Sequence, residues 1–133
     1  MAGDAIVLDS GALTAFVEGG QAIRVALQKE LIAGSEVRVP TAVVAESATG
    51  ESGRDARLNR ALKSMVLVDL DERTARRAAA LRHANRFRRS GTIDAIVIAT
   101  ADGIPRTRVL TTDADDLRPL AAVNRRSVVV SVG

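Results

Sequence analysis

The order of apolar and polar positions along the chain predicts short strands that alternate with helices. Five short runs are largely apolar and do not alternate with polar residues, which is typical of strands buried on both faces of a sheet. The predicted strands lie at Ala5–Leu8, Val37–Val39, Val66–Leu70, Arg108–Thr111 and Ser127–Val132. Such strands, separated by helices, indicate a three-layer α/β/α fold with a central parallel sheet.

The segments between the strands carry the apolar spacing of helices. One helical face combines Ile23, Ala26, Leu27 and Leu31 and stops at Gly34. Further helices are predicted to follow Asp9, to open at Pro40, to include Leu58–Met65, to run from a capping Asp71 to just before Gly91, and to cover Asp94–Ala101 behind a capping Thr92. Ligands of open α/β sheets bind beyond the carboxyl ends of the strands, so the residues that follow strands are the candidates for function.

Length and composition describe an ordinary folded protein. The 133 residues have the size of one domain, and we expect a single domain over residues 1–133. An apolar share of 47% and a charged share of 26% exclude a disordered or fibrous chain. No apolar run approaches the roughly 20 residues of a membrane span, and the start lacks the pattern of a secretory signal. We therefore expect a cytoplasmic protein with no membrane contact.

The residues that are missing restrict the chemistry. The chain has no cysteine, and His83 is its single histidine, so a metal ion would have to bind oxygen ligands. Oxygen ligands favour hard cations such as Mg²⁺ or Mn²⁺ over zinc or copper. Phe16 and Phe87 are the only aromatic residues, which makes stacking of nucleic-acid bases a poor option.

Acidic residues follow the predicted strands or lie on the adjacent helices. The four candidates are Asp9, Glu46, Asp94 and Asp113. Glu46 follows a run of aliphatic residues, so we expect a carboxylate among buried side chains that needs a partner. Each also has an ordinary structural explanation, such as a helix N-cap, a favourable charge at the positive end of a helix, or a solvated helix face. Asp115 and Asp116 add charge beside Asp113, and either a bound cation or exposure to water and salt would relieve the repulsion.

Taken in order, four segments resemble the PIN-domain family. They are Ile6–Ser10, Pro40–Glu46, Asp94–Ala99, and Leu110–Asp113 with Asp116–Leu117. The resemblance covers nearly the whole chain. In length, order and spacing the chain is most similar to the VapC toxins of bacterial toxin–antitoxin pairs, which are PIN domains with nothing appended.

The resemblance implies an endoribonuclease that depends on Mg²⁺ or Mn²⁺ and that acts as the toxin of such a pair. Asp9 and Asp94 would be the principal metal ligands, and Glu46 and Asp113 would complete the cluster directly or through water. Asp116 matches an additional acidic position of some members. The implied partners are an RNA substrate, a cognate antitoxin and a second copy in a homodimer. One or two cations on carboxylates suffice to activate water and neutralise charge, and the sequence leaves their number open.

Two further features bear on the substrate. Family members often carry Ser or Asn where this chain has Gly11, and we expect Ser10 or Thr111 to supply the missing group. Arg82, Arg86 and Arg89 would share one face of a continuous helix near Asp94, and we assign them to RNA phosphates. Arg73, Arg76 and Arg77 fall nearly opposite and suit a solvated surface or a partner contact, and an ordinary exposed face is the alternative for either trio.

Other classes of protein share parts of this pattern. The main alternative is a catalytically silent PIN-like module that binds RNA or a partner, and the presence of all four acids argues against it. A structure-specific DNA nuclease shares the acids but surrounds the core with additional helices. A haloacid-dehalogenase-type phosphatase needs a second Asp where Gly11 stands, and a receiver domain needs a lysine near its last strand, where this chain has none.

Overall fold

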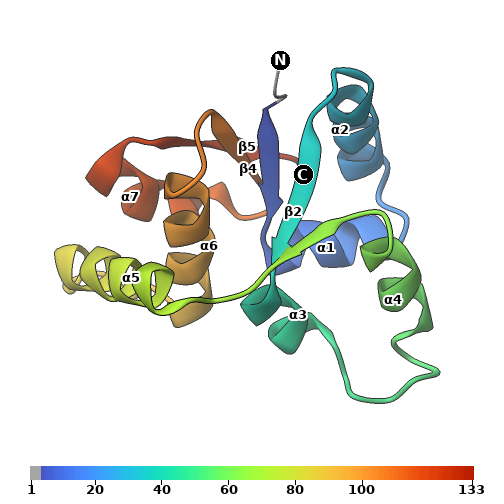
Figure 1. The fold of residues 1–133 in the computed structure, drawn as a ribbon, viewed down its shortest axis with the longest axis horizontal. Helices are drawn as coiled ribbons and strands as arrows, with labels where there is room; N and C mark the ends of the chain where they lie inside the picture. Colours follow the sequence, from blue (N-terminus) through green and yellow to red (C-terminus); the bar gives the residue numbers. More distant parts are fainter. Residues whose placement is uncertain (1–3) are drawn as a thin grey trace.

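A sheet of five parallel strands forms the centre of the molecule, in a computed structural model that describes residues 4–133 (Figure 1). The strands are β1 (Ala5–Leu8), β2 (Glu36–Pro40), β3 (Val66–Val68), β4 (Thr107–Thr111) and β5 (Ser127–Ser131). Their order across the sheet is β3-β2-β1-β4-β5. All neighbouring pairs are parallel, which confirms the predicted sheet.

Helices cover both faces of this sheet. They are α1 (Ser10–Val17), α2 (Gln21–Ile32), α3 (Thr41–Ser47), α4 (Ala56–Leu62), α5 (Glu72–Ala84), α6 (Thr92–Asp102) and α7 (Ala114–Asn124). Figure 1 shows α5, α6 and α7 on one side of β1 and β2, and α1, α2 and α4 on the other. The fold is therefore the three-layer α/β/α arrangement that the pattern predicts.

The direction in which the strand order proceeds reverses beside β1, and this reversal forms a crevice at the edge of the sheet. From β1 the sheet continues through β2 and β3 in one direction and through β4 and β5 in the other. Leu8 pairs with Leu110, so β1 and β4 end at nearly the same level. The order of the strands reverses between these two neighbours, and that is where ligands of open sheets bind. Asp9 directly follows β1, and Asp113 lies two residues after β4.

The core explains why these strands and α6 are so apolar. Ile6, Val7 and Leu8 are fully buried, and every residue of α6 from Ala95 to Asp102 is buried as well. Full burial of one large aliphatic side chain contributes about 1.5–3 kcal/mol, so β1 and α6 form a rigid base for the residues at their ends. Within residues 4–133, no helix has the length and apolar character needed to cross a bilayer.

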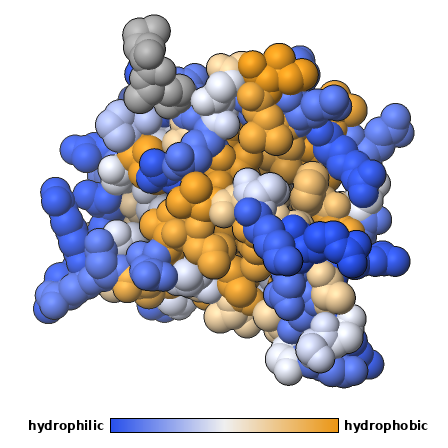
Figure 2. Space-filling view, turned by 45° about the vertical axis from the view of Figure 1, so that its right-hand side comes forward, coloured by the Kyte–Doolittle hydropathy of each residue, from blue (hydrophilic) through white to orange (hydrophobic). Residues whose placement is uncertain are grey.

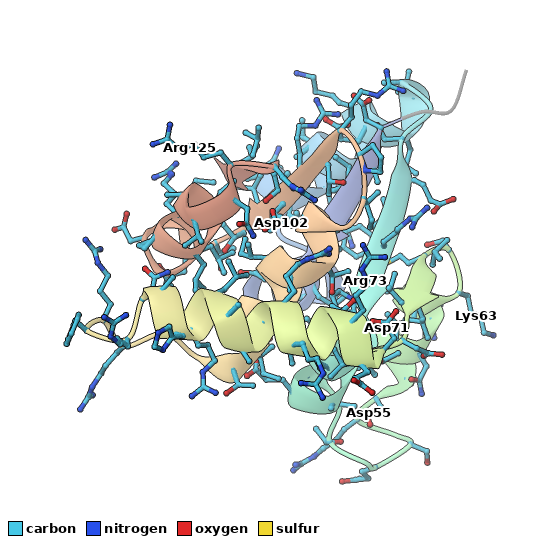
Figure 3. The ribbon with its side chains drawn as sticks, turned by 60° about the vertical axis from the view of Figure 1, so that its left-hand side comes forward. Asp55, Lys63, Asp71, Arg73, Asp102 and Arg125 are labelled. Atoms are coloured by element: carbon cyan, nitrogen blue, oxygen red, sulfur yellow. The ribbon has the colours of Figure 1, made fainter. Side chains whose placement is uncertain are left out.

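Asp102 anchors the end of α6. Its buried carboxylate accepts hydrogen bonds from Asn124 Nδ2 on α7 and from Ser127 Oγ on β5, both at 3.1 Å (Figure 3). A buried carboxylate needs such donors. Asp102 therefore has a structural role, at the opposite end of α6 from Asp94.

The start and end of α5 differ in how well the sequence predicts them. Asp71 caps the helix as expected, because its carboxylate accepts from Thr74 N at 2.8 Å (Figure 3). The expectation that the helix continues almost to Gly91 is wrong, since α5 ends at Ala84 and turns follow. Asn85 is the C-cap, and its backbone N–H and its side-chain amide both donate to Leu81 O at 3.1 Å.

Three smaller expectations are also wrong. Thr92 is the first residue of α6 and not its cap, because Gly91 occupies the N-cap position without a side chain to bond. Leu31 belongs to the predicted inner face of α2 but is 55% exposed, since that end of the helix extends past the core. The third strand ends at Val68, two residues early, at the edge of the sheet where only β2 pairs with it. Apolar side chains consequently lie open on the face that carries α2 and β3 (Figure 2).

Candidate active site

Asp9 is held rigidly at the end of β1. It occupies the N-cap of α1, and its Oδ1 accepts a hydrogen bond from Ala12 N at 2.8 Å. Its other oxygen, Oδ2, accepts from the hydroxyl of Thr111 at the end of β4. Asp9 is buried, and burial is the main reason that its pKa lies above the ordinary value, followed by the charges of Asp113 and Glu46, although the two hydrogen bonds act in the opposite direction.

Thr111 is the fixed point between the two strand ends. Its side chain is fully buried, and its Oγ1 accepts a hydrogen bond from Asp113 N at 2.9 Å. With this lone pair occupied, the hydroxyl hydrogen is donated to Asp9. Sequence reasoning expects Thr111 near the substrate, whereas the structure engages its hydroxyl in orienting Asp9.

Glu46 stands in the last turn of α3. The sequence suggests a carboxylate among buried aliphatic side chains, but the structure places Glu46 in an exposed position. The apolar neighbours in sequence lie on other faces of the helix, with Val43 in the core. Glu46 Oε1 accepts a hydrogen bond from Ser10 Oγ in the first turn of α1, which ties α3 to the residue after Asp9.

Asp94 lies in the first turn of α6 and is half-buried. Among residues 4–133 its carboxylate accepts no hydrogen bond and forms no ion pair, which is unusual for a partly buried charge. Its pKa is raised to about 6, first by burial and then by the negative charges of other carboxylates. Those carboxylates are Asp116, Asp9, Glu46 and Asp113. All the acids that the sequence analysis selects therefore act on Asp94.

The acids at the start of α7 divide into two roles. Asp113 holds the N-cap position, yet its side chain makes no capping bond. A hydrogen bond and the charge of Asp113 raise the pKa of Asp116, so these two carboxylates interact directly. Asp115 is almost fully exposed and lies 4.0 Å from Arg118, in a weak surface ion pair. Asp116 therefore belongs to the acidic group and Asp115 does not.

These five carboxylates make a site with much negative charge and no positively charged partner among the described residues. No Lys, Arg or His in the described part of the chain forms an ion pair with any of them. Asp9 and Glu46 are turned to hydroxyl donors, and in residues 4–133 no three acids stand close enough to hold a metal ion between them. The donor set is all oxygen, which suits a hard divalent cation. The pKa of Asp9 and that of Asp94 are raised first by burial and then by neighbouring carboxylates, and a bound cation would oppose both effects.

The raised pKa of Asp94 predicts how the stability of the metal-free protein depends on pH. An aspartate of the unfolded chain titrates near 3.9, so between about pH 4 and 6 the folded state binds more protons, and stability decreases as pH rises. Asp55 and Asp71, whose pKa values are lowered, act below that window. Thermal melts in chelator should show a lower Tm at pH 7 than at pH 5, and Asp94→Asn should flatten the difference. A wild-type Tm that increases over this range would contradict the assignment.

Thr112 is a residue of this site that the sequence analysis misses. A Cβ at residue 11 would overlap the hydroxyl of Thr112, so the Thr112 side chain fills the space that a larger residue would occupy. Both residues line a cavity of about 500 Å³, together with Ser10, Thr14 and Glu46. The absence of a side chain at Gly11 is the only signal in the sequence, and it does not reveal which residue fills the gap.

The arginines expected on one helical face are arranged differently. Because α5 ends at Ala84, Arg86 and Arg89 lie beyond the helix, and the premise of a shared face with Arg82 is wrong. A cavity of about 360 Å³ instead gathers Arg82, Arg86 and Arg88 with His83. Arg88 lines this cavity and Arg89 is not among its lining residues.

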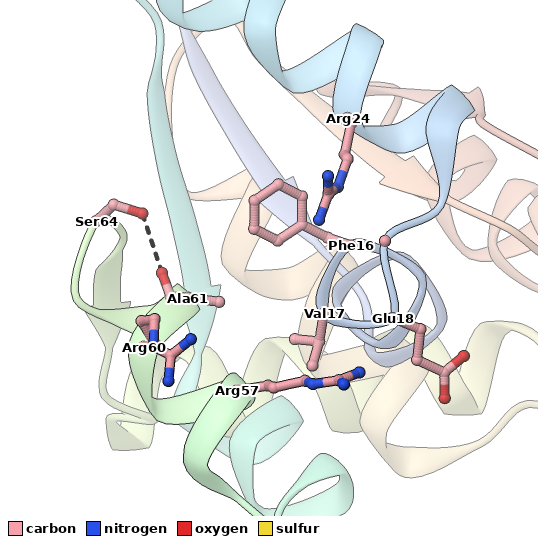
Figure 4. Close-up of a pocket in the computed structure, with 9 residues that line it drawn as sticks. Phe16, Val17, Glu18, Arg24, Arg57, Arg60, Ala61 and Ser64 are labelled. Carbon is pink, nitrogen blue, oxygen red and sulfur yellow. Dashed lines mark hydrogen bonds between the residues drawn. The ribbon is translucent and has the colours of Figure 1, made fainter.

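A third cavity, of about 450 Å³, lies between α1, α2 and α4 and shares Glu18 with the cavity beside Glu46 (Figure 4). Phe16, Val17 and Ala61 give it an apolar wall. Arg24, Arg57 and Arg60 place positive charge around it, and Figure 4 shows Arg57 extending past Val17. The cavity suits an apolar segment that carries acidic side chains.

The family model described as PIN domain matches residues 6–122. A search of curated proteins finds no match. Solved structures with similar folds include chains of the DNA-bound VapBC2 of Rickettsia felis (11% identity, TM-score 0.76, 97% of this chain and 99% of that chain) and of a toxin–antitoxin complex of Klebsiella pneumoniae (20%, 0.74, 96% and 98%). DNA-bound VapBC of Salmonella typhimurium is similar (13%, 0.74, 97% and 98%). At these identities the likeness concerns the fold.

Proposed function

Because the chain belongs to the PIN-domain family, we propose that it is an endoribonuclease that hydrolyses RNA phosphodiester bonds with Mg²⁺ or Mn²⁺. The observation that carries the proposal is Asp94, a half-buried carboxylate with no hydrogen bond within residues 4–133 and with four acids acting on it. We propose further that residues 1–133 form one nuclease domain and that the protein is the toxin of a bacterial toxin–antitoxin pair in the cytoplasm. Its similarity in fold to chains of VapBC complexes supports that role.

In this mechanism the acids hold the cation and the strand ends orient them. Asp9 and Asp94 would be direct ligands, with Glu46, Asp113 and Asp116 binding directly or through water. A cation bound there would supply an activated water and would neutralise charge on the phosphate and the leaving oxygen. Thr111 keeps one oxygen of Asp9 in a fixed direction.

Hydroxyl groups next to the acids suit the sugar and phosphate of the cleaved nucleotide. Ser10, Thr14 and Thr112 line the 500 Å³ cavity beside Glu46. Ser47 lines the same cavity, but its Oγ is buried without a hydrogen-bond partner among the described residues. The exposed hydroxyls of Thr14 and Thr112 are therefore the groups that a sugar or phosphate would meet there.

The test is cleavage of RNA by the purified protein. We expect cleavage with Mg²⁺ or Mn²⁺ and none in excess chelator. Cleavage that persists in excess chelator would exclude a metal-dependent mechanism. Binding of RNA without turnover under any metal supports the alternative, a catalytically silent PIN-like module.

The basic cavity predicts how RNA binding responds to salt. Each phosphate contact contributes about 0.7 to the logarithmic salt slope on single strands. Replacing Arg82 and Arg86 by Ala should therefore weaken binding and make the slope less steep by about 1.4, if each contacts one phosphate. Arg57→Ala, on α4 at the other cavity, is the matched control and should leave the slope unchanged. Equal slopes in all three proteins would show that Arg82 and Arg86 do not contact phosphates and belong to an ordinary exposed surface.

We place a cognate antitoxin at the apolar cavity between α1, α2 and α4. Its three arginines favour a partner segment with acidic side chains, and its apolar wall favours a buried anchor. Coexpression with the product of a small open reading frame immediately upstream of the gene should give a copurifying complex. The double variant Arg57→Glu, Arg60→Glu should not copurify with the antitoxin. Copurification equal to that of the unmodified protein would contradict the placement. A homodimer remains part of the proposal.

A further inference from the structure

Phe87 is the most exposed large apolar residue in the described part of the chain, at 90%. It lies in the segment of turns between α5 and α6, residues 85–91. The other aromatic residue, Phe16, lines the cavity between α1, α2 and α4. An aromatic ring left in water contributes nothing to the core, so its position calls for another explanation than folding.

The surroundings of Phe87 are cationic. The guanidinium of Arg86 lies over the ring, 4.7 Å from its centroid. Because Phe87 is 90% exposed, the opposite face of the ring is open to solvent. Arg88 and Arg89 follow directly, and Arg82, Arg86 and Arg88 line the adjacent cavity. A docking surface for a protein core would surround the ring with apolar side chains. Arginines around an open ring instead suit a polyanion that also carries π-faces.

The segment also leads directly to the acids. It ends at Gly91, the N-cap of α6, and Asp94 lies in the first turn of that helix. The Gly91 position is close to Asp94, since a Cβ there would lie 3.5 Å from Asp94 Oδ2. A strand whose phosphates contact the arginines after α5 would therefore run toward the acidic site.

We propose that Phe87 is a stacking contact for one unpaired base of the substrate. Arg86 lies over one face of the ring and, with Arg82 and Arg88, binds the neighbouring phosphates, while the base stacks on the other face of the ring. The inference rests on the proposed function, and it adds that the substrate is single-stranded at this point. It also revises the expectation that base stacking is a poor option for this chain.

The chain offers a direct optical test. It contains no Trp and no Tyr, so Phe87→Trp introduces a single indole whose fluorescence reports contact at this position alone. Ile32→Trp is the matched control, since Ile32 is 80% exposed on α2, in another part of the molecule. The probes are a uridine 12-mer and an abasic 12-mer with the same phosphates, added in chelator so that the strand is not consumed.

We expect the uridine 12-mer to quench Phe87→Trp, the abasic strand to leave it unchanged, and neither strand to affect Ile32→Trp. Phe87→Ala should lose affinity for the uridine 12-mer by about 5- to 150-fold, which is the range for one stacked base, and keep its affinity for the abasic strand. Phe87→Leu should behave like Phe87→Ala, since it restores apolar volume without a π-face. Equal affinity of wild type and Phe87→Ala for the uridine strand overturns the inference.

A protein contact at Phe87 gives a different result. In that case Phe87→Ala changes the oligomeric state in sedimentation velocity and leaves oligonucleotide affinity unchanged, which also overturns the inference. Failure of the proposed function is separate, because it appears as absence of metal-dependent RNA cleavage by the unmodified protein.

Discussion

Replacing Asp94 by asparagine is expected to abolish RNA cleavage while leaving the metal-free protein at least as stable as the unmodified one. The amide keeps the shape of the side chain and removes a charge that the fold disfavours, as the pKa of about 6 shows. Loss of a favourable charge at the start of α6 costs about 0.3–1 kcal/mol, and relief of the repulsion from four carboxylates offsets it. Stabilisation by added Mn²⁺ should collapse together with activity, because a principal ligand is gone.

Asp102→Asn is the matched control for this experiment. It makes the same chemical change on the same helix, at the end remote from the acids. Asp102 accepts bonds from Asn124 and Ser127 while buried, so the amide is expected to lower stability by about 1–3 kcal/mol. Cleavage and the response of the Tm to Mn²⁺ should remain.

Thermal melts of the two variants, with and without Mn²⁺, separate a metal site from a structural acid. A metal site predicts that the response to Mn²⁺ is lost in Asp94→Asn and kept in Asp102→Asn. If Asp94 only complements the positive end of α6, Asp94→Asn is destabilised and still responds to Mn²⁺. That second pattern would exclude Asp94 from the active site.

The local pattern of apolar and polar residues predicts much of the fold. The apolar run of Ala5–Leu8 predicts β1 to the residue, and Asp71 predicts the start of α5. Both depend on interactions within a few residues, namely burial on two faces and a cap to the backbone three residues on. The order of the strands then brings Asp9 and Asp113 to one crevice, as expected for any open parallel sheet.

What the sequence does not reveal depends on contacts between distant segments. Glu46 and Leu31 are expected to be buried but are exposed, because the helices that pack beside a residue decide its exposure. Thr112 fills the space at Gly11 only because β4 ends beside β1. The open ring of Phe87 follows from the early end of α5 at Asn85, which the arginine-rich sequence does not indicate.

Thr111→Val is expected to lower cleavage at neutral pH by about 10- to 100-fold, the range for a residue that orients a metal ligand. The change keeps the volume of a fully buried side chain and removes the hydroxyl that bonds Asp9 and accepts from Asp113 N. That hydroxyl lowers the pKa of Asp9, so its removal raises the pKa further and protons compete better for the ligand. The pH profile of cleavage should shift toward higher pH, and alkaline conditions should recover part of the loss.

The conservative variant decides whether the hydroxyl or the packing matters. Thr111→Ser retains the donor to Asp9 and loses one methyl group, so it should keep the pH profile of the unmodified protein even if its Tm decreases. Thr111→Val should lose about 1–3 kcal/mol of stability through the unpaired groups, and its defect in cleavage should exceed that of Thr111→Ser at equal stability. Because an unfolded fraction lowers the rate equally at all pH values, a shifted profile reports on Asp9 itself. A Thr111→Val protein that cleaves with an unchanged profile would show that Asp9 does not depend on this hydroxyl.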